Sequence, residues 1–129
     1  MTAAPRLLLL LIAFNGLLAV GAGAFGAHAA ADPPVRDWLR TAAAYQLPHA
    51  AAALAVLALW PGRRTVAWLF AAGALVFGVS LDLLALTGAR AWGAVTPIGG
   101  LLLLAGWAVL GWAALRGSSA SERQRLTPS

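Results

Sequence analysis

Four long apolar segments, separated by short stretches that hold nearly all of the charge, constrain this chain more than any other feature. They cover residues 7–27, 41–60, 66–86 and 97–115. An α-helix needs about 20 apolar residues to cross the roughly 30 Å of bilayer hydrocarbon. Short connections favour neighbouring helices that run antiparallel. The sequence therefore predicts an all-α integral membrane protein, with a four-helix antiparallel bundle over residues 1–116 and a polar tail over 117–129.

Composition agrees with a membrane protein and restricts its partners. Of 129 residues, 61% are hydrophobic and only 10% are charged, and nine basic residues outnumber four acidic ones. The basic residues are arginines that lie between and beyond the apolar segments instead of along one face, so we expect contact with anionic lipid headgroups and not with nucleic acid. The absence of cysteine excludes disulfides, iron–sulfur clusters and thiolate zinc sites.

The first apolar segment has one competing interpretation. Arg6 precedes it, and the small residues Ala27 and Ala29 around His28 resemble a signal-peptidase site. The apolar run is about 20 residues long, whereas a signal peptide has a core of 7 to 15. We therefore expect a retained helix, with cleavage as the alternative.

Arginine counts predict the orientation of the bundle. With four crossings, one membrane face holds six arginines, at positions 6, 63, 64, 116, 123 and 125. The other face holds three, at positions 36, 40 and 90. Because positive residues are retained on the cytoplasmic side, both termini are predicted to be cytoplasmic.

Small residues at helical spacing predict the faces along which the helices pack, since close approach of helices in lipid depends on them. The residues that we assign to helix packing are Asn15, Gly23, Gly26, Gly78, Gly99, Gly100 and Gly106. Residues 21–26 match the pattern GxGxxG, but no strand precedes them, so packing is a better explanation than dinucleotide binding. Asn15 and Trp107 lie at similar depths, about 12 Å from the inner face, which predicts a hydrogen bond between them. Thr96 and Pro97 are expected to begin the fourth helix.

Polar residues within the apolar segments are the candidates for function, because ionisable groups in lipid are costly and usually face protein or a cavity. They gather in the predicted outer half of the bundle, at His28, Tyr45, Gln46, His49, Ser80, Asp82, Thr87 and Thr96. His49 is suited to bind a metal or haem, to relay protons, or simply to join helices by a hydrogen bond. Asp82 is either a proton or cation site, or a carboxyl that is protonated or paired with Arg90 or a histidine.

Several motifs in order resemble one known family. They are GAFGAH at 23–28, TAxxYQxxHA at 41–50, GxSLxxLALTG at 78–88, TPIGG at 96–100 and AGW at 105–107. Together they resemble domain-of-unknown-function family 423 (the UPF0382 family, whose animal member is transmembrane protein 256) over about residues 7–115. The resemblance implies a small multi-pass protein of the bacterial plasma membrane and implies no particular activity. The chain departs from it at Asp82, where related sequences tend to have an aromatic residue.

For function, the sequence favours a non-enzymatic accessory or scaffold component of a membrane assembly, with a membrane-protein partner or a second copy of the chain. No nucleophile, base and orienting group recur at workable spacing, so an enzyme is not predicted. One alternative is a haem or metal site that uses His28 and His49, although their expected heights differ by about 12 Å. Another is a path for a small solute or protons through the outer polar residues. The sequence assigns no cofactor and no metal.

Overall fold

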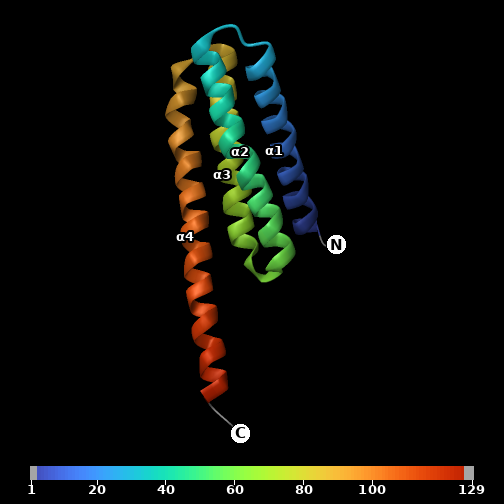
Figure 1. Ribbon diagram of the computed structural model, residues 1–129, viewed down its shortest axis with the longest axis vertical. Coiled ribbons are helices and arrows are strands. Elements are labelled where there is room, and N and C mark those ends of the chain that lie inside the picture. The colour runs from blue at the N-terminus through green and yellow to red at the C-terminus, as the bar shows by residue number, and fades with distance from the viewer. Residues whose placement is uncertain (1–2, 127–129) are drawn as a thin grey trace.

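The computed structural model describes residues 3–126, and side chains from 5 to 117. Its elements are α1 (Ala3–His28), α2 (Pro33–Leu59), a short 3-10 helix η1 (Pro61–Arg63), α3 (Arg64–Thr87) and α4 (Arg90–Leu126). Successive helices run in opposite directions, so that both ends of the chain lie toward the same end of the molecule (Figure 1). All four helices are long and apolar enough to cross a membrane. The predicted all-α, four-helix membrane architecture is confirmed.

The second helix begins earlier than the apolar segment that predicted it. Asp32 has an extended backbone (φ −75°, ψ 121°), and prolines occupy the first turn of α2, which starts at Pro33. Proline is tolerated there because the first N–H groups of a helix have no intrahelical partner. Residues 35–40, which include Arg36, Asp37 and Arg40, therefore belong to the first turns of a helix that is longer than its apolar part.

The prediction that Thr96 and Pro97 begin the fourth helix is wrong. Gly88 ends α3 in the left-handed region (φ 68°), with its N–H bonded to the Leu84 carbonyl at 2.8 Å. The chain turns at once, and α4 starts at Arg90 with Pro97 inside it. A proline within a helix removes one hydrogen bond without preventing the helix from continuing when neighbouring contacts hold it. At its other end α4 continues to Leu126, into the stretch that we had expected to be a separate polar tail.

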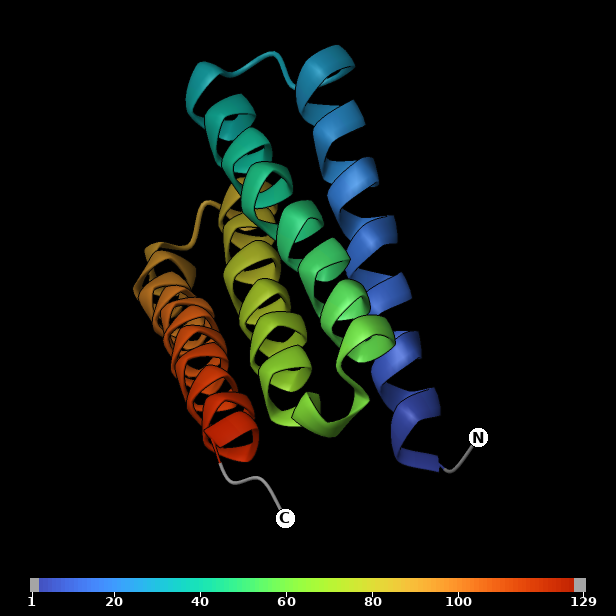
Figure 2. The same ribbon diagram turned by 60° about the horizontal axis from the view of Figure 1, so that its bottom comes forward.

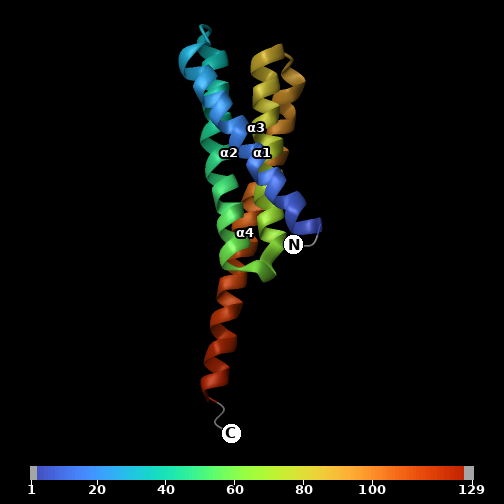
Figure 3. The same cartoon turned by 90° about the vertical axis from the view of Figure 1, so that its right-hand side faces the viewer.

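The helices are arranged around α3. It packs against α1, α2 and α4, whereas α1 packs against α2 and α3, and α4 packs extensively against α3 alone. Within residues 3–126, α1 and α4 share at most an isolated contact, and Figure 2 shows them on opposite sides of the molecule. The side view in Figure 3 shows α4 continuing beyond the ends of the other helices. The bundle is thus open between α1 and α4.

Most of the hydrophobic core lies among the first three helices. Its largest cluster contains one residue of α4, Leu103, and otherwise consists of residues from α1, α2 and α3: Leu8, Ile12, Ala50, Ala53, Val56, Val66, Ala67, Phe70, Ala71 and Ala74. Many of these are alanines, which allow helix backbones to approach closely in lipid, where no hydrophobic effect drives helices together. The core is therefore held by close packing of small side chains around a few large ones.

Glycines bring α4 against α3. A Cβ added at Gly99 would collide with the backbone nitrogen of Phe77, and one at Gly106 would lie 2.7 Å from the Phe70 ring. Gly100 is less tightly placed, because a Cβ there would lie 3.9 Å from the Phe77 ring. Gly99 and Gly106 are one heptad apart and share a helix face, so the two close approaches fall on one seam.

The α1–α2 contact is also made over glycine. A Cβ at Gly26 would lie 3.1 Å from Leu39 Cβ, and one at Gly23 would lie 3.5 Å from Ala43 Cβ. The buried face of α1 continues inward from Gly26 through small residues to Asn15. This face carries Asn15 into the interior, where its polar side chain needs partners.

Candidate functional site

The predicted polar residues do not form one cluster. Helical residues point about 100° apart from one position to the next, so polar residues at similar depth face different neighbours. The structure divides them into a buried amide pair, an aromatic crevice, a hydroxyl pair, an open groove and two exposed helix ends. Gln46 belongs to the amide pair, Tyr45 and His49 line the aromatic crevice, and Ser80 and Thr96 form the hydroxyl pair. Asp82 lies in the open groove, and His28 and Thr87 lie at the exposed helix ends.

The amide pair joins three helices in the interior. Asn15 and Gln46 are both 0% exposed, and Gln46 Nε2 donates to Asn15 Oδ1 at 2.9 Å. Asn15 Nδ2 in turn donates to the carbonyls of Leu11 at 2.9 Å and Ala71 at 3.1 Å. The Gln46 amide occupies the space where a side chain at Gly78 would lie, so Gly78 makes room for it. The predicted bond between Asn15 and Trp107 is wrong, because Asn15 faces α2 and α3 while α4 lies on the other side of α3.

Trp107 instead pairs with His49. Its indole Nε1 donates to His49 Nε2 at 3.0 Å, and His49 Nδ1 lies 2.6 Å from the Tyr45 carbonyl. An indole N–H can only donate and a carbonyl can only accept, so the imidazole is neutral and carries its hydrogen on Nδ1. The lone pair through which this ring would bind a metal is therefore occupied. Of the alternatives for His49, the geometry favours a hydrogen bond that joins α2 to α4.

The His49–Trp107 pair borders a crevice between α2 and α4. The crevice has a volume of about 650 Å³, and its walls include Tyr45, Gly100 and Leu104. Two aromatic rings of α3 pack beside the crevice. Phe70 contacts Trp107 and Phe77 contacts Tyr45, each with ring centroids 4.8 Å apart. The crevice is mostly apolar, and both ring nitrogens of His49 already form hydrogen bonds within the protein.

The two histidines lie far apart along the bundle. His28 is exposed at the end of α1, whereas His49 lies 16 residues into α2, about 24 Å along that helix. This separation is twice the one expected from sequence, because α2 starts at Pro33. One iron cannot bridge the pair, and no group of three or more metal-ligating residues occurs among the described side chains.

The hydroxyl residues have structural partners. Ser80 Oγ donates to the Phe77 carbonyl at 2.9 Å and lies 2.8 Å from Thr96 Oγ1, which links α3 to α4. Thr87 Oγ1 donates to the Leu83 carbonyl at 2.6 Å and accepts from the Ala89 N–H at 3.2 Å, so it closes the end of α3. Neither arrangement resembles an activated nucleophile, which needs an adjacent base.

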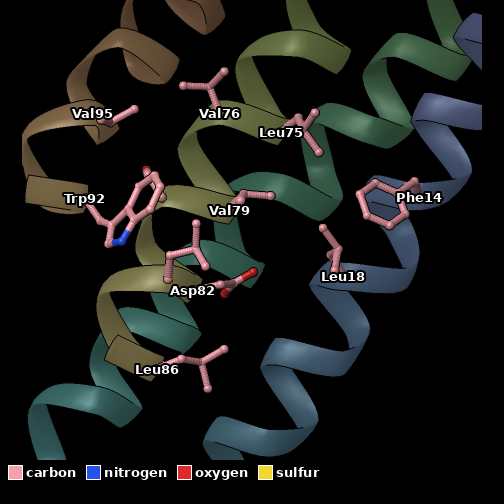
Figure 4. Close-up of a pocket in the computed structure, with 11 residues that line it drawn as sticks. Phe14, Leu18, Leu75, Val76, Val79, Asp82, Leu86, Trp92 and Val95 are labelled. Carbon is pink, nitrogen blue, oxygen red and sulfur yellow. The ribbon is translucent and has the colours of Figure 1, made fainter. Parts of the chain in front are cut away.

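Asp82 lies in the opening between α1 and α4, which we call the Asp82 groove. Its floor is α3, its α1 wall contains Phe14 and Leu18, its α4 wall contains Trp92 and Val95, and its volume is about 520 Å³ (Figure 4). In Figure 4 the carboxyl group points from α3 toward the α1 side.

Asp82 has no partner within the described part of the chain. Its Oδ1 atom is buried without a hydrogen-bond partner. The structure pairs it with neither Arg90 nor a histidine, contrary to one of our expectations. Arg90 lies beyond the Gly88 turn, where the chain has already left α3.

The groove continues along α1. A second hollow of about 260 Å³ adjoins it, shares Leu18, Asp82 and Leu86 with it, and extends to Gly21 and Phe25. From Phe14 to Phe25 the two hollows follow α1 for about 16 Å, which is about three helical turns. Asp82 therefore lies at the junction of one elongated, largely apolar groove.

Sequence reasoning missed the wall residues of this groove and the partner of His49. Phe14, Leu18 and Val95 look like any lipid-facing apolar residues, so no sequence signal distinguishes them. Trp107 did carry a signal, because it is the one tryptophan well inside a predicted span. An indole N–H in hydrocarbon needs an acceptor, and His49 at a similar depth supplies one.

Comparisons with known proteins give a consistent result. Residues 22–100 match the family described as "Protein of unknown function (DUF423)". The chain is 39% identical over 119 residues to a UPF0382 membrane protein of Staphylococcus epidermidis, covering 86% of this chain and 97% of that protein. It is 38% identical over 120 residues to the UPF0382 inner membrane protein YgdD of Escherichia coli K12, covering 86% and 91%. No solved structure gave a significant match.

Proposed function

From the premise that this chain belongs to the DUF423 family, and is a multi-pass protein of the inner membrane, we propose that it is a non-enzymatic accessory component of a membrane assembly. In this proposal it binds a further transmembrane helix in the Asp82 groove. The two named relatives are called membrane proteins and carry no enzyme name.

The observation that carries the proposal is the opening over α3. Three helices pack closely around one another, but α1 and α4 share at most an isolated contact within residues 3–126, and part of α3 is left uncovered between them. The groove is about three helical turns long, and its walls are apolar side chains from three helices. A helix laid into such a groove gains the van der Waals packing that drives helix association in lipid.

The remaining polar residues support a structural role over a chemical one. The buried amide pair, the Ser80–Thr96 link and the His49–Trp107 bond each connect neighbouring helices. They also lie in separate places, so they do not form the continuous polar path that movement of a solute or protons would require. With the His49 lone pair occupied and His28 about 24 Å away along the bundle, a shared haem is the least supported alternative.

Site-specific photo-crosslinking in cells tests the proposal. A photoreactive amino acid at Leu75 or Val79 places the probe in the groove, and the same probe at Leu54, which is 47% exposed on α2, is the matched control. We expect a protein adduct of one discrete mass from the groove positions and lipid adducts from Leu54. The adduct is identified by mass, and probes in the partner helix should then label the groove in return.

Two results would decide against this function or specify it further. Lipid adducts alone from all three positions would show that no helix occupies the groove, and the proposal would be wrong. An adduct with twice the mass of this chain would identify a second copy as the partner and would support docking of a helix.

A further inference from the structure

We propose that the helix bound in the Asp82 groove carries a lysine or arginine that pairs with Asp82. This inference rests on the proposed function, and it specifies the chemistry of the partner. It starts from a carboxyl group that lies within a membrane-spanning helix, with Oδ1 buried and no hydrogen-bond partner among residues 5–117.

The residues around Asp82 provide no hydrogen-bond donor to its carboxylate oxygens, so a donor has to come from outside the described part of the chain. The walls at this level are hydrocarbon side chains such as Leu18, Val79 and Leu86. Trp92, on the α4 wall, makes no hydrogen bond to Asp82, and Arg90 does not form an ion pair with it. A carboxyl group in hydrocarbon is costly unless a donor or a cation meets it, and acids within membrane spans usually face such a partner.

Depth favours a helix over a lipid amine as the source of that cation. Asp82 lies five residues before the end of α3 at Thr87, about 8 Å below that end. The amine of a phospholipid lies outside its phosphate, so it would have to sink into hydrocarbon to reach the carboxyl. A lysine or arginine on a packed helix is held at its depth by the helix, and its long apolar stem suits the apolar walls.

Length favours the same occupant. The hollows on either side of Asp82 extend about 16 Å along α1, so an occupant that met only the carboxyl would leave most of the groove unfilled. A helix fills it with side chains over about three turns and presents one cation at the junction. The surface therefore fits an apolar helix with a single basic residue near its end.

Reconstitution with synthetic helices tests the inference. The full chain has no cysteine, so a single Ala31→Cys change in the exposed loop after α1 accepts a fluorophore. It is mixed in phosphatidylcholine vesicles with labelled 21-residue Leu/Ala transmembrane peptides, and binding is measured by energy transfer. One peptide has a lysine five residues from one end, a second has leucine there, and a third has lysine at its centre.

We expect the first peptide to bind about tenfold more tightly than the other two. Asp82→Asn and Asp82→Leu should reduce this preference to less than about twofold, since either change removes the charge. Asp37→Asn, which removes an exposed acid at the start of α2, should leave the preference unchanged. Because Asp82 has no internal partner, its variants should fold, and monodispersity in detergent checks that they do.

The outcomes separate this inference from the proposed function. Equal binding of all three peptides would overturn the basic partner and leave helix docking supported. A preference that persists in both Asp82 variants would place the site elsewhere and overturn the inference. A preference that disappears when phosphatidylethanolamine replaces part of the phosphatidylcholine would identify a lipid amine as the occupant and would also overturn it. Binding of none of the peptides would contradict the inference and helix docking together.

Discussion

At the scale of the residue, two hydrogen-bonded side-chain pairs connect helices: Asn15 with Gln46 in the interior, and His49 with the half-exposed Trp107 in the crevice between α2 and α4. Sequence reasoning assigned depths to these residues from a rise of about 1.5 Å per residue, and the earlier start of α2 doubles the distance expected between the start of that helix and His49. It paired Asn15 with Trp107 wrongly, since depth says nothing about the direction in which a side chain points. That direction depends on helix rotation, which packing sets.

The buried amide pair should show energetic coupling. Asn15→Ala and Gln46→Leu each remove one end of the bond and leave the other end unpaired within the core. In a double-mutant cycle we expect a coupling free energy of about 1 kcal/mol, measured by unfolding in mixtures of denaturing and mild detergent. A cycle of Asn15→Ala with Thr87→Val, at the exposed end of α3, should be additive. Additivity in both cycles would contradict the amide bond.

The tautomer of His49 gives a second prediction for single residues. In the native protein, ¹⁵N resonances of the ring should show a protonated Nδ1 and an unprotonated Nε2, because Tyr45 accepts and Trp107 donates. Trp107→Phe removes the donor, so a population of His49 rings protonated at Nε2 should appear beside the Nδ1-protonated form. Trp92→Phe, which lies in the Asp82 groove about four helical turns from Trp107, is the control and should leave the spectrum unchanged. A charged ring at neutral pH would show that the assigned bonds do not form.

At the scale of the helix, the sequence predicted the existence of each element better than its ends. Apolar length identified all four helices, because only a helix with about 20 apolar residues suits the bilayer. The same criterion missed the start of α2 at Pro33 and of α4 at Arg90, since residues 33–40 and 90–96 lie outside the apolar segments that identified the helices. The Gly88 turn is so short that α4 begins before Pro97, which a rule for proline at helix starts cannot anticipate.

The α3–α4 seam should be sensitive to a single methyl group. Gly99→Ala places a Cβ against the Phe77 backbone, which cannot move aside as a flexible side chain does, so we expect a loss of about 1–3 kcal/mol in the free energy of unfolding. Gly111→Ala is the matched control in the same helix, because nothing lies within 4 Å of its Cβ position. Detergent unfolding curves measure both. Equal stability of the two variants would mean that α4 does not approach α3 as described.

For the whole molecule, the antiparallel arrangement places both termini at one end, and the arginine distribution predicts that this end is cytoplasmic (Figure 1). Single cysteines at Ala31, between α1 and α2, and at Gly62, in the turn before α3, lie at opposite ends. In intact cells an impermeant thiol reagent should label Ala31→Cys and leave Gly62→Cys unlabelled until the membrane is opened. The reverse pattern would invert the topology.

The Asp82 groove could be predicted from the sequence only in part. Asp82 was recognisable as an unusual acid in a span, but the groove around it exists because α1 and α4 share at most an isolated contact in the described part of the chain. That arrangement depends on how far each helix is rotated around α3. Composition and spacing do not determine it, because Leu, Val and Phe suit lipid and a groove wall equally well.

The weak contact between α1 and α4 also bears on how a helix would reach the proposed site in the Asp82 groove. The Asn15–Gln46 bond and all but one residue of the main core belong to the first three helices. The groove lies between α1 and α4, which are both long and apolar enough to cross a membrane. In the proposed complex a binding helix would therefore enter sideways, by diffusion in the plane of the bilayer, and neither aqueous surface of the protein would have to open to admit it.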